Sequence, residues 1–182
     1  MNAAVVQRLT QLMLLKAGPQ DLPALPSLYH TPIGLFLITA VIRLLLFAGL
    51  LEAAAQAALS VVLLIIYVRS LLNWRKTPER LTQTLAALLL TGAVIGLLTL
   101  LPLQALKPAL LAFAENPEMG PQQIQVPAMA VYAWLGLAIW GLVISAHIYR
   151  HALEVSLGMG VAISLLYEFL LIGVVGVLGS IF

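Results

Sequence analysis

The sequence contains no cysteine and very few charged residues. The absence of cysteine excludes disulfide bonds, thiol catalysis and cysteine-ligated metal sites. Asp, Glu, Lys and Arg together make up only 9% of the 182 residues, whereas soluble globular domains carry about 25%. The chain therefore cannot cover itself with a water-compatible surface. Its net charge of +2 is also too small to indicate a nucleic-acid partner.

Hydrophobic residues make up 62% of the sequence and gather into five long apolar blocks. Each block can cross a bilayer as a helix, because about 20 apolar residues span the hydrocarbon core and a helix satisfies its own backbone groups. We expect an all-α, polytopic membrane protein whose residues 31–182 form a bundle of five transmembrane helices. The predicted spans are residues 33–51, 54–73, 83–103, 127–148 and 156–181.

The boundary between the first two spans has no strong marker. No proline or glycine lies between Gly49 and Arg75, yet one continuous helix would be much longer than a bilayer requires. We place the break at Glu52, the first charged residue in the apolar region that follows Arg43.

Residues 1–30 are more polar and are expected to lie outside the bundle. Between residues 1 and 16, apolar side chains such as Val5, Leu9 and Leu12 recur at helical spacing with polar residues between them. This pattern predicts an amphipathic helix on the membrane surface. The following stretch, AGPQDLPALPSLYH, contains three prolines and Gly18, which is typical of a connector.

The basic residues predict the orientation. With five spans, one side of the membrane receives seven of them and the other receives only Lys107. Because basic loops stay in the cytoplasm, the sequence predicts a multi-pass protein of the bacterial inner membrane with a cytoplasmic N-terminus and an external C-terminus. The seven are Arg8, Lys16, Arg69, Arg75, Lys76, Arg80 and Arg150.

Two charged residues fall deep inside predicted spans. At 1.5 Å per residue, Arg43 lies ~15 Å into the first span and Glu168 lies at ~20 Å in the fifth. Intramembrane charges usually pair with one another or with backbone carbonyls. We therefore hypothesise an ion pair between Arg43 and Glu168 inside the bundle. In the alternative, each charge separately meets water or carbonyls in a cavity.

Small residues recur in two of the spans. Gly92 and Gly96 form a GxxxG pattern in the third span, and Gly173 and Gly176 make the fifth span thin. Small residues let transmembrane helices approach closely. We favour packing within the bundle over a dimer interface.

His147, His151 and Glu154 have ligand-like spacing. On a continuous helix they would form one stripe, and two imidazoles one turn apart can share a metal ion. A proton-sensitive contact is the other functional interpretation, because histidine titrates near neutrality. We expect these side chains to be interfacial and to hold no metal.

Three segments resemble the Yip (Ypt-interacting protein) family of small membrane proteins, in particular its bacterial members. They are GPQDLPALPSL, RLTQTLAALLLTGAVIGLL and AWLGLAIWGLVISAHIYRHALEVSLG, which together cover most regions of the chain. The resemblance implies five spans with a cytoplasmic N-terminus. Eukaryotic members of the family act in vesicle traffic with small GTPases.

The sequence contains none of the catalytic motifs that can be recognised by spacing. It has no phosphate-binding loop, no GxSxG nucleophile elbow and no HExxH zinc motif. We predict a non-enzymatic scaffold or assembly factor without a cofactor, which contacts membrane lipid and a protein partner in the membrane. The alternative is a small transporter or ion conduit that uses Arg43 and Glu168.

Overall fold

The computed structural model describes residues 3–22, 30–116, 118 and 124–179, and these form helices joined by short turns. No strand occurs within these ranges, so the all-α class is confirmed for the part of the chain that is described. The helices are α1 (Ala3–Met13), α2 (His30–Leu44), α3 (Leu50–Trp74), α4 (Leu81–Leu98), α5 (Leu100–Glu115), α6 (Ala128–Leu153) and α7 (Leu157–Gly179), with 3-10 turns η1 (Pro19–Asp21) and η3 (Pro78–Arg80).

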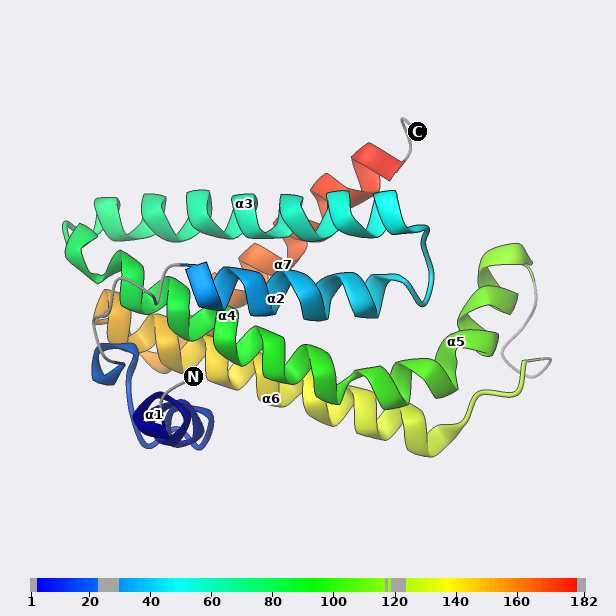
Figure 1. Ribbon diagram of the computed structural model, residues 1–182, viewed down its shortest axis with the longest axis horizontal. Helices are drawn as coiled ribbons and strands as arrows, with labels where there is room; N and C mark the ends of the chain where they lie inside the picture. Colours follow the sequence, from blue (N-terminus) through cyan, green and yellow to red (C-terminus); the bar gives the residue numbers. More distant parts are fainter. Residues whose placement is uncertain (1–2, 23–29, 117, 119–123, 180–182) are drawn as a thin grey trace.

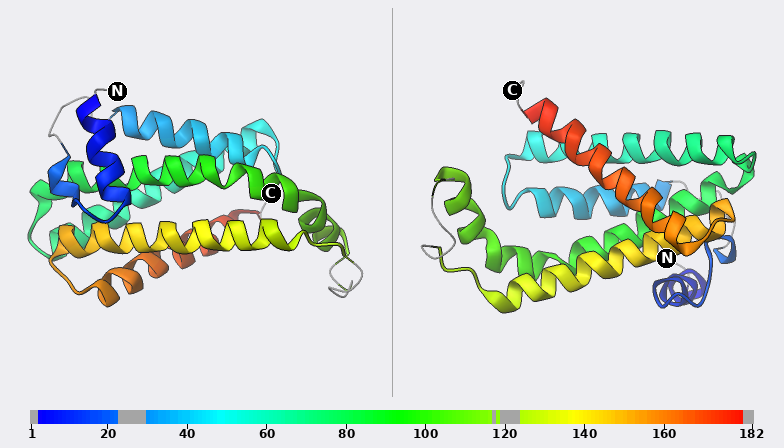
Figure 2. Two further views of the ribbon diagram at one scale, coloured as in Figure 1. Left: turned by 90° about the horizontal axis from the view of Figure 1, so that it is seen from below. Right: turned by 180° about the vertical axis from the view of Figure 1, so that it is seen from behind.

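Helices α2, α3, α4 and α6 run along the long axis of the molecule, and α7 crosses behind them (Figure 1). The turns between α3 and α4 and between α6 and α7 lie at one end, which we call the basic end because it carries Arg75, Lys76, Arg80 and Arg150. The turn between α2 and α3, helix α5 and the C-terminal end of α7 lie towards the opposite end (Figure 2). Helix α1 lies across the bundle near the basic end.

Among the described residues, four helices are long and apolar enough to cross a membrane, which suggests a multi-pass membrane protein. The first is α3, and the second is the stretch Pro78–Leu98, which contains α4. The third is α6, and the fourth is α7 over Leu157–Gly176. Helix α2 is apolar but has 15 residues, which is about 22 Å of helix against a hydrocarbon core of about 30 Å. Four of the five spans expected from the sequence thus correspond to helices of sufficient length, and the first corresponds to the shorter α2.

The break between the first two spans lies a few residues before the predicted position. Helix α2 ends at Leu44, and Gly49 is the N-cap of α3, with φ −70° and ψ 164°. Glu52 is in the first turn of α3, where its negative charge interacts favourably with the positive end of the helix dipole. It accepts a hydrogen bond of 3.0 Å from Gln56 Nε2, one turn further along the helix.

The predicted third span is interrupted at Thr99, where α4 ends and α5 begins. Pro102 explains the interruption, because its ring would clash with the carbonyl of Leu98 and it has no N–H to donate. The Thr99 hydroxyl donates to the carbonyl of Gly96 at 2.9 Å. The apolar residues 100–103 thus leave the axis of α4 and start a second helix. The predicted fourth span, residues 127–148, ends too early, because α6 continues to Leu153.

Helix α1 uses its apolar face inside the protein. Val5, Leu9 and Leu12 are 4%, 5% and 0% exposed and belong to the same hydrophobic cluster as residues of α4 and α6. Trp140 of α6 also donates from Nε1 to the carbonyl of Met13 at 3.3 Å. The apolar spacing predicted from the sequence therefore produces a helix that packs against the bundle, with polar residues such as Arg8 on its exposed side.

Helix α4 is the centre of the bundle. In its apolar spanning stretch, 56% of the residues are buried within the chain. The corresponding share is 11% in α6 and 17% in α7. Helix α4 packs against α2, α3, α6 and α1. Because these stretches of α6 and α7 bury so few residues, many of their apolar side chains are available to lipid or to another protein. The C-terminal part of α6 is buried, since Ile144, Ile148 and Tyr149 are 2% exposed or less.

Candidate functional site

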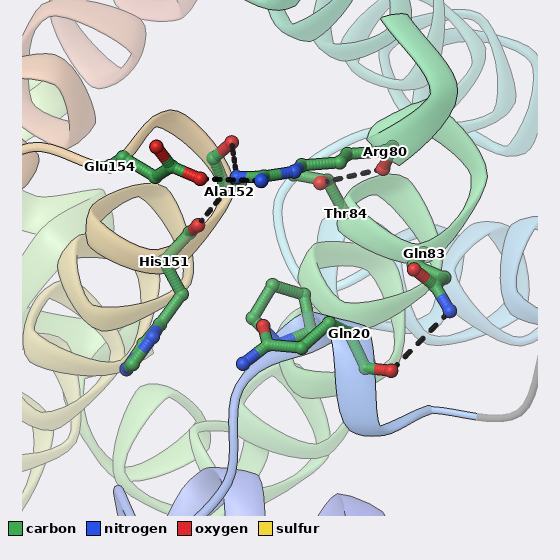
Figure 3. Close-up of a pocket in the computed structure, with 8 residues that line it drawn as sticks. Gln20, Arg80, Gln83, Thr84, His151, Ala152 and Glu154 are labelled. Atoms are coloured by element: carbon green, nitrogen blue, oxygen red, sulfur yellow. Dashed lines mark hydrogen bonds and ion pairs between the residues drawn. The ribbon is translucent and has the colours of Figure 1, made fainter. Parts of the chain in front are cut away.

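Two arginines, Arg75 and Arg80, converge on the C-terminal end of α6 at the basic end, and Figure 3 shows the contacts of Arg80. Arg80 Nη1 donates to the carbonyls of His151 and Ala152 at 3.3 and 3.1 Å. Arg75 Nε donates to the carbonyl of Leu153 at 3.0 Å. The last carbonyls of a helix have no partner within the helix and carry a partial negative charge. The two guanidinium groups satisfy them and stabilise the end of α6.

Glu154 ends α6 in the left-handed conformation, with φ 54° and ψ 50°. This turn directs its carboxylate to Nη2 of Arg80, with which it forms an ion pair. Arg80 lowers the pKa of the Glu154 carboxyl below its usual value, first through the hydrogen bond and then through its charge. Because Glu154 is outside the helix, the stripe of three ligand-like residues expected from the sequence does not form.

His147 and His151 do lie one turn apart on α6, and their ring centroids are 4.5 Å apart with the rings nearly perpendicular. His147 is 8% exposed, and its Nε2 is 3.0 Å from the carbonyl of Ala17, which makes it a contact between α6 and the segment after α1. Within the described residues, no group of three or more His, Cys, Asp or Glu side chains could hold a metal ion.

A cavity of about 310 Å³ opens beside this arginine cluster. Gln83 lines it and donates from Nε2 to the carbonyls of Leu22 and Gln20, at 3.1 and 3.4 Å, which holds η1 against α4. Its charged groups, Arg80 and Glu154, are already bonded to each other. The cavity is lined by Pro19, Gln20, Arg80, Gln83, Thr84, His151, Ala152 and Glu154.

A second polar cluster joins α3 and α7 through two tyrosines. Tyr67 of α3 donates its hydroxyl to the carbonyl of Ile163 at 2.7 Å, and Tyr167 of α7 donates to the carbonyl of Ser60 at 3.0 Å. The two ring centroids are 5.5 Å apart. Tyr149 of α6 approaches Tyr67 edge-on, with centroids 6.3 Å apart. The spacing of these tyrosines along the sequence does not indicate this reciprocal contact.

Arg43 and Glu168 interact electrostatically, but they do not form the ion pair expected from the sequence. Each side chain lies within the range of the other's charge. Among the described residues, however, the structure contains no contact of 4.0 Å or less between their charged atoms. Helix α7 packs mainly on α6 and α3 and diverges from α2, so the two side chains remain separated. Glu168 is exposed on the surface of the chain, whereas Arg43 is partly buried.

The glycines divide into two groups. A Cβ on Gly92 would be 2.9 Å from the Phe36 side chain, and one on Gly96 would be 3.8 Å from that of Thr39, so both glycines face α2. Gly173 and Gly176 have nothing within 4 Å of such a Cβ, so they form no close packing within the chain, in contrast to the expectation.

Another close approach between two helices involves a glycine that the sequence did not single out for packing. A Cβ on Gly160 of α7 would be 2.3 Å from the carbonyl oxygen of Ala146 of α6. The signal for this contact was present in the sequence, because Gly160 and Ala146 are small residues on successive spans.

No family model, curated protein or solved structure matches the chain. The resemblance to the Yip family therefore stays a prediction that rests on the three segments named above.

Proposed function

We propose that the chain is a non-enzymatic scaffold or assembly factor of the bacterial inner membrane, which crosses the bilayer five times. The observation that carries this proposal is that polar side chains at the basic end bond to backbone carbonyls of neighbouring elements. Arg75 and Arg80 cap α6, His147 contacts the segment after α1, and Gln83 holds η1. These described polar groups bond to backbone carbonyls and thereby stabilise the fold, while α6 and α7 offer apolar surfaces.

Helix α2 is proposed as the fifth crossing. It lies between α3 and α4 and runs from the basic end towards the opposite end (Figure 1). A short span is tolerated when the bilayer thins locally or flanking polar groups extend to the interface. Five crossings put the basic end in the cytoplasm by the positive-inside rule, and they put the C-terminus outside.

The exposed face of α7 is the proposed contact surface for a membrane protein partner. Phe169 and Ile172 are 68% and 66% exposed there, and Gly173 and Gly176 have open space beside them. Glycines allow a neighbouring helix to approach closely in a membrane.

A photo-crosslinking amino acid at Ile172 would test the scaffold. We expect a crosslinked protein of defined mass in cells, present in the same complex after purification in mild detergent. The same group at Ala87, which is 0% exposed, is the control and should give only crosslinks within the chain. Crosslinks to lipid alone, with the purified chain free of other proteins, would argue against a scaffold.

The alternative function is a small transporter or ion conduit, and the electrostatic contact between Arg43 and Glu168 favours it. This alternative requires flux through the purified protein in liposomes. The flux must be lost when Glu168 is replaced by glutamine.

A further inference from the structure

Two hydroxyl groups are buried without a hydrogen-bond partner at the junction of α6 and α7. Tyr149 is 2% exposed and Ser164 is 3% exposed, and neither hydroxyl has a partner among the described residues. A buried hydroxyl without a hydrogen bond is costly, so each such group needs an explanation. An ordered water molecule or a ligand that both hydroxyls share would provide one.

The helix geometry brings the side chains of Tyr149 and Glu168 towards the level of Ser164. Ser164 and Glu168 are four residues apart on α7, so they lie on the same face one turn apart. Side chains on a helix lean towards its N-terminus. The chain turns back between α6 and α7, so Tyr149 leans away from the basic end and Glu168 leans towards it. Both therefore point towards the level of Ser164.

The charged and titratable groups around Glu168 come from several elements. Arg43 of α2, Tyr149 of α6 and its neighbour Tyr167 on α7 interact with it electrostatically. The ring of Tyr67 on α3 lies against both tyrosines, and its hydroxyl donates a hydrogen bond to the backbone of α7. The Tyr167 hydroxyl donates a hydrogen bond to the backbone of α3. Tyr149 is thus the nearby phenol whose hydroxyl is free to take part in a site.

We propose that Glu168 is a proton-binding site, and that Tyr149 and Ser164 hydrogen-bond to its carboxylate through an ordered water. A hydronium ion transfers its proton to the carboxylate, which leaves a neutral carboxylic acid and a water molecule. The two hydroxyls donate to the water, which donates to the carboxylate and so favours its ionised form. Arg43 favours the ionised form through its charge. The site goes beyond the scaffold function and does not depend on it.

A hydrophobic carbodiimide tests the site directly, because it modifies protonated carboxyl groups in apolar surroundings. The acid gives its proton to a carbodiimide nitrogen, and its oxygen bonds to the central carbon. The O-acylisourea then rearranges to a stable N-acylurea. The protein in lipid nanodiscs is treated over a range of pH values, and modification is measured by mass spectrometry of peptides. We expect modification at Glu168, and its loss as pH rises.

The variants distinguish a hydroxyl-supported site from a lone carboxylate. Tyr149→Phe combined with Ser164→Ala should shift the midpoint of modification upward by about one pH unit. The matched control combines Tyr132→Phe with Ser70→Ala, because both residues are exposed on α6 and α3, and it should leave the midpoint unchanged. No modification of Glu168 at any pH, or an equal shift in both double variants, would overturn the proposal.

A spectroscopic measurement keeps the proposal testable if the double variant does not fold. The infrared band of a protonated carboxyl group should appear in the wild-type protein as pH falls, and Glu168→Gln should remove it. The single variant Tyr149→Phe retains the ring that packs against Tyr67 and should shift the pH at which the band appears. A band unaffected by Glu168→Gln would contradict the assignment. Loss of a protein partner would affect none of these readouts, so failure of the scaffold function is a separate outcome.

Discussion

Arg80 bonds Glu154 with Nη2 while Nη1 reaches two carbonyls at the end of α6. One guanidinium group therefore joins the start of α4, the end of α6 and the turn into α7. The ion pair is exposed, but the carbonyl contacts are partly buried and would lose their donor if the arginine were replaced. The two partners should thus differ in their importance for stability.

Arg80→Leu should lower the free energy of unfolding by about 1–2 kcal/mol, because it removes charge-assisted hydrogen bonds to the helix end. Glu154→Gln should have a smaller effect, since it removes only the exposed ion pair. Thermal unfolding in detergent measures both. Arg69→Leu is the control, because Arg69 is exposed on α3 and forms no hydrogen bond or ion pair with the described residues. Equal losses for Arg80→Leu and Glu154→Gln would show that the carbonyl contacts contribute little.

The Arg80–Glu154 contact should also give a small dependence of stability on pH. Arg80 lowers the pKa of Glu154 in the folded protein, so the stabilisation is fully present above the ordinary carboxyl pKa of about 4.3. It is lost as pH falls through the lowered pKa of the folded state. The difference in melting temperature between wild type and Glu154→Gln should therefore shrink in acid. A difference that grows as pH falls would contradict this sign.

Gly160→Ala should destabilise the contact between α6 and α7. Its new methyl group would meet the Ala146 carbonyl oxygen, which belongs to rigid helix backbone. Overpacking of this kind costs about 1–3 kcal/mol. Gly158→Ala is the matched control two residues away, since nothing lies within 4 Å of its Cβ position, and it should be neutral or stabilising by up to about 1 kcal/mol. If both variants unfold at the same temperature, the helices are further apart than described.

Long apolar runs were enough to predict α3, α6 and α7 to within about five residues at each end, because burial in a bilayer constrains both composition and length. The helix breaks were harder to predict. Gly49 is a recognisable cap, but Pro102 acts on a carbonyl four residues earlier, so the break at Thr99 falls inside an unbroken apolar run. The left-handed turn at Glu154 has no local signal, because glycine is the usual residue there.

The candidate sites depend on tertiary contacts that spacing does not encode. Tyr67 and Tyr167 are 100 positions apart in the sequence, and only the packing of α3 on α7 brings them together. The sequence identified Arg43 and Glu168 as the costly intramembrane charges, but their heights along two helices could not show the divergence of α2 from α7. It could not reveal that His147 contacts the segment after α1 either, since that segment bends back onto α6.

The number of crossings can be tested with single cysteines, since the chain has none of its own. If α2 crosses the membrane, Arg8 and Glu52 lie on opposite sides. Both residues are exposed. A cysteine that replaces Glu52 should react with a membrane-impermeant thiol reagent in intact cells, and one that replaces Arg8 should react only after lysis. Reaction at both positions in intact cells would mean that α2 does not cross.

A double-mutant cycle separates the electrostatic contact between Arg43 and Glu168 from an ion pair. Removal of one partner from a directly bonded buried pair costs about 3–5 kcal/mol, because the other charge is left uncompensated. The structure contains no such bond between these two side chains, and Glu168 can be neutralised by a proton whereas arginine stays charged. We therefore expect Arg43→Leu and Glu168→Leu to give a coupling energy below about 1 kcal/mol, measured from the unfolding of the four proteins in detergent. Arg69→Leu combined with Glu168→Leu is the control cycle and should give no coupling. A coupling of several kcal/mol would mean that the two charges bond directly in the membrane, with α2 and α7 closer together than described.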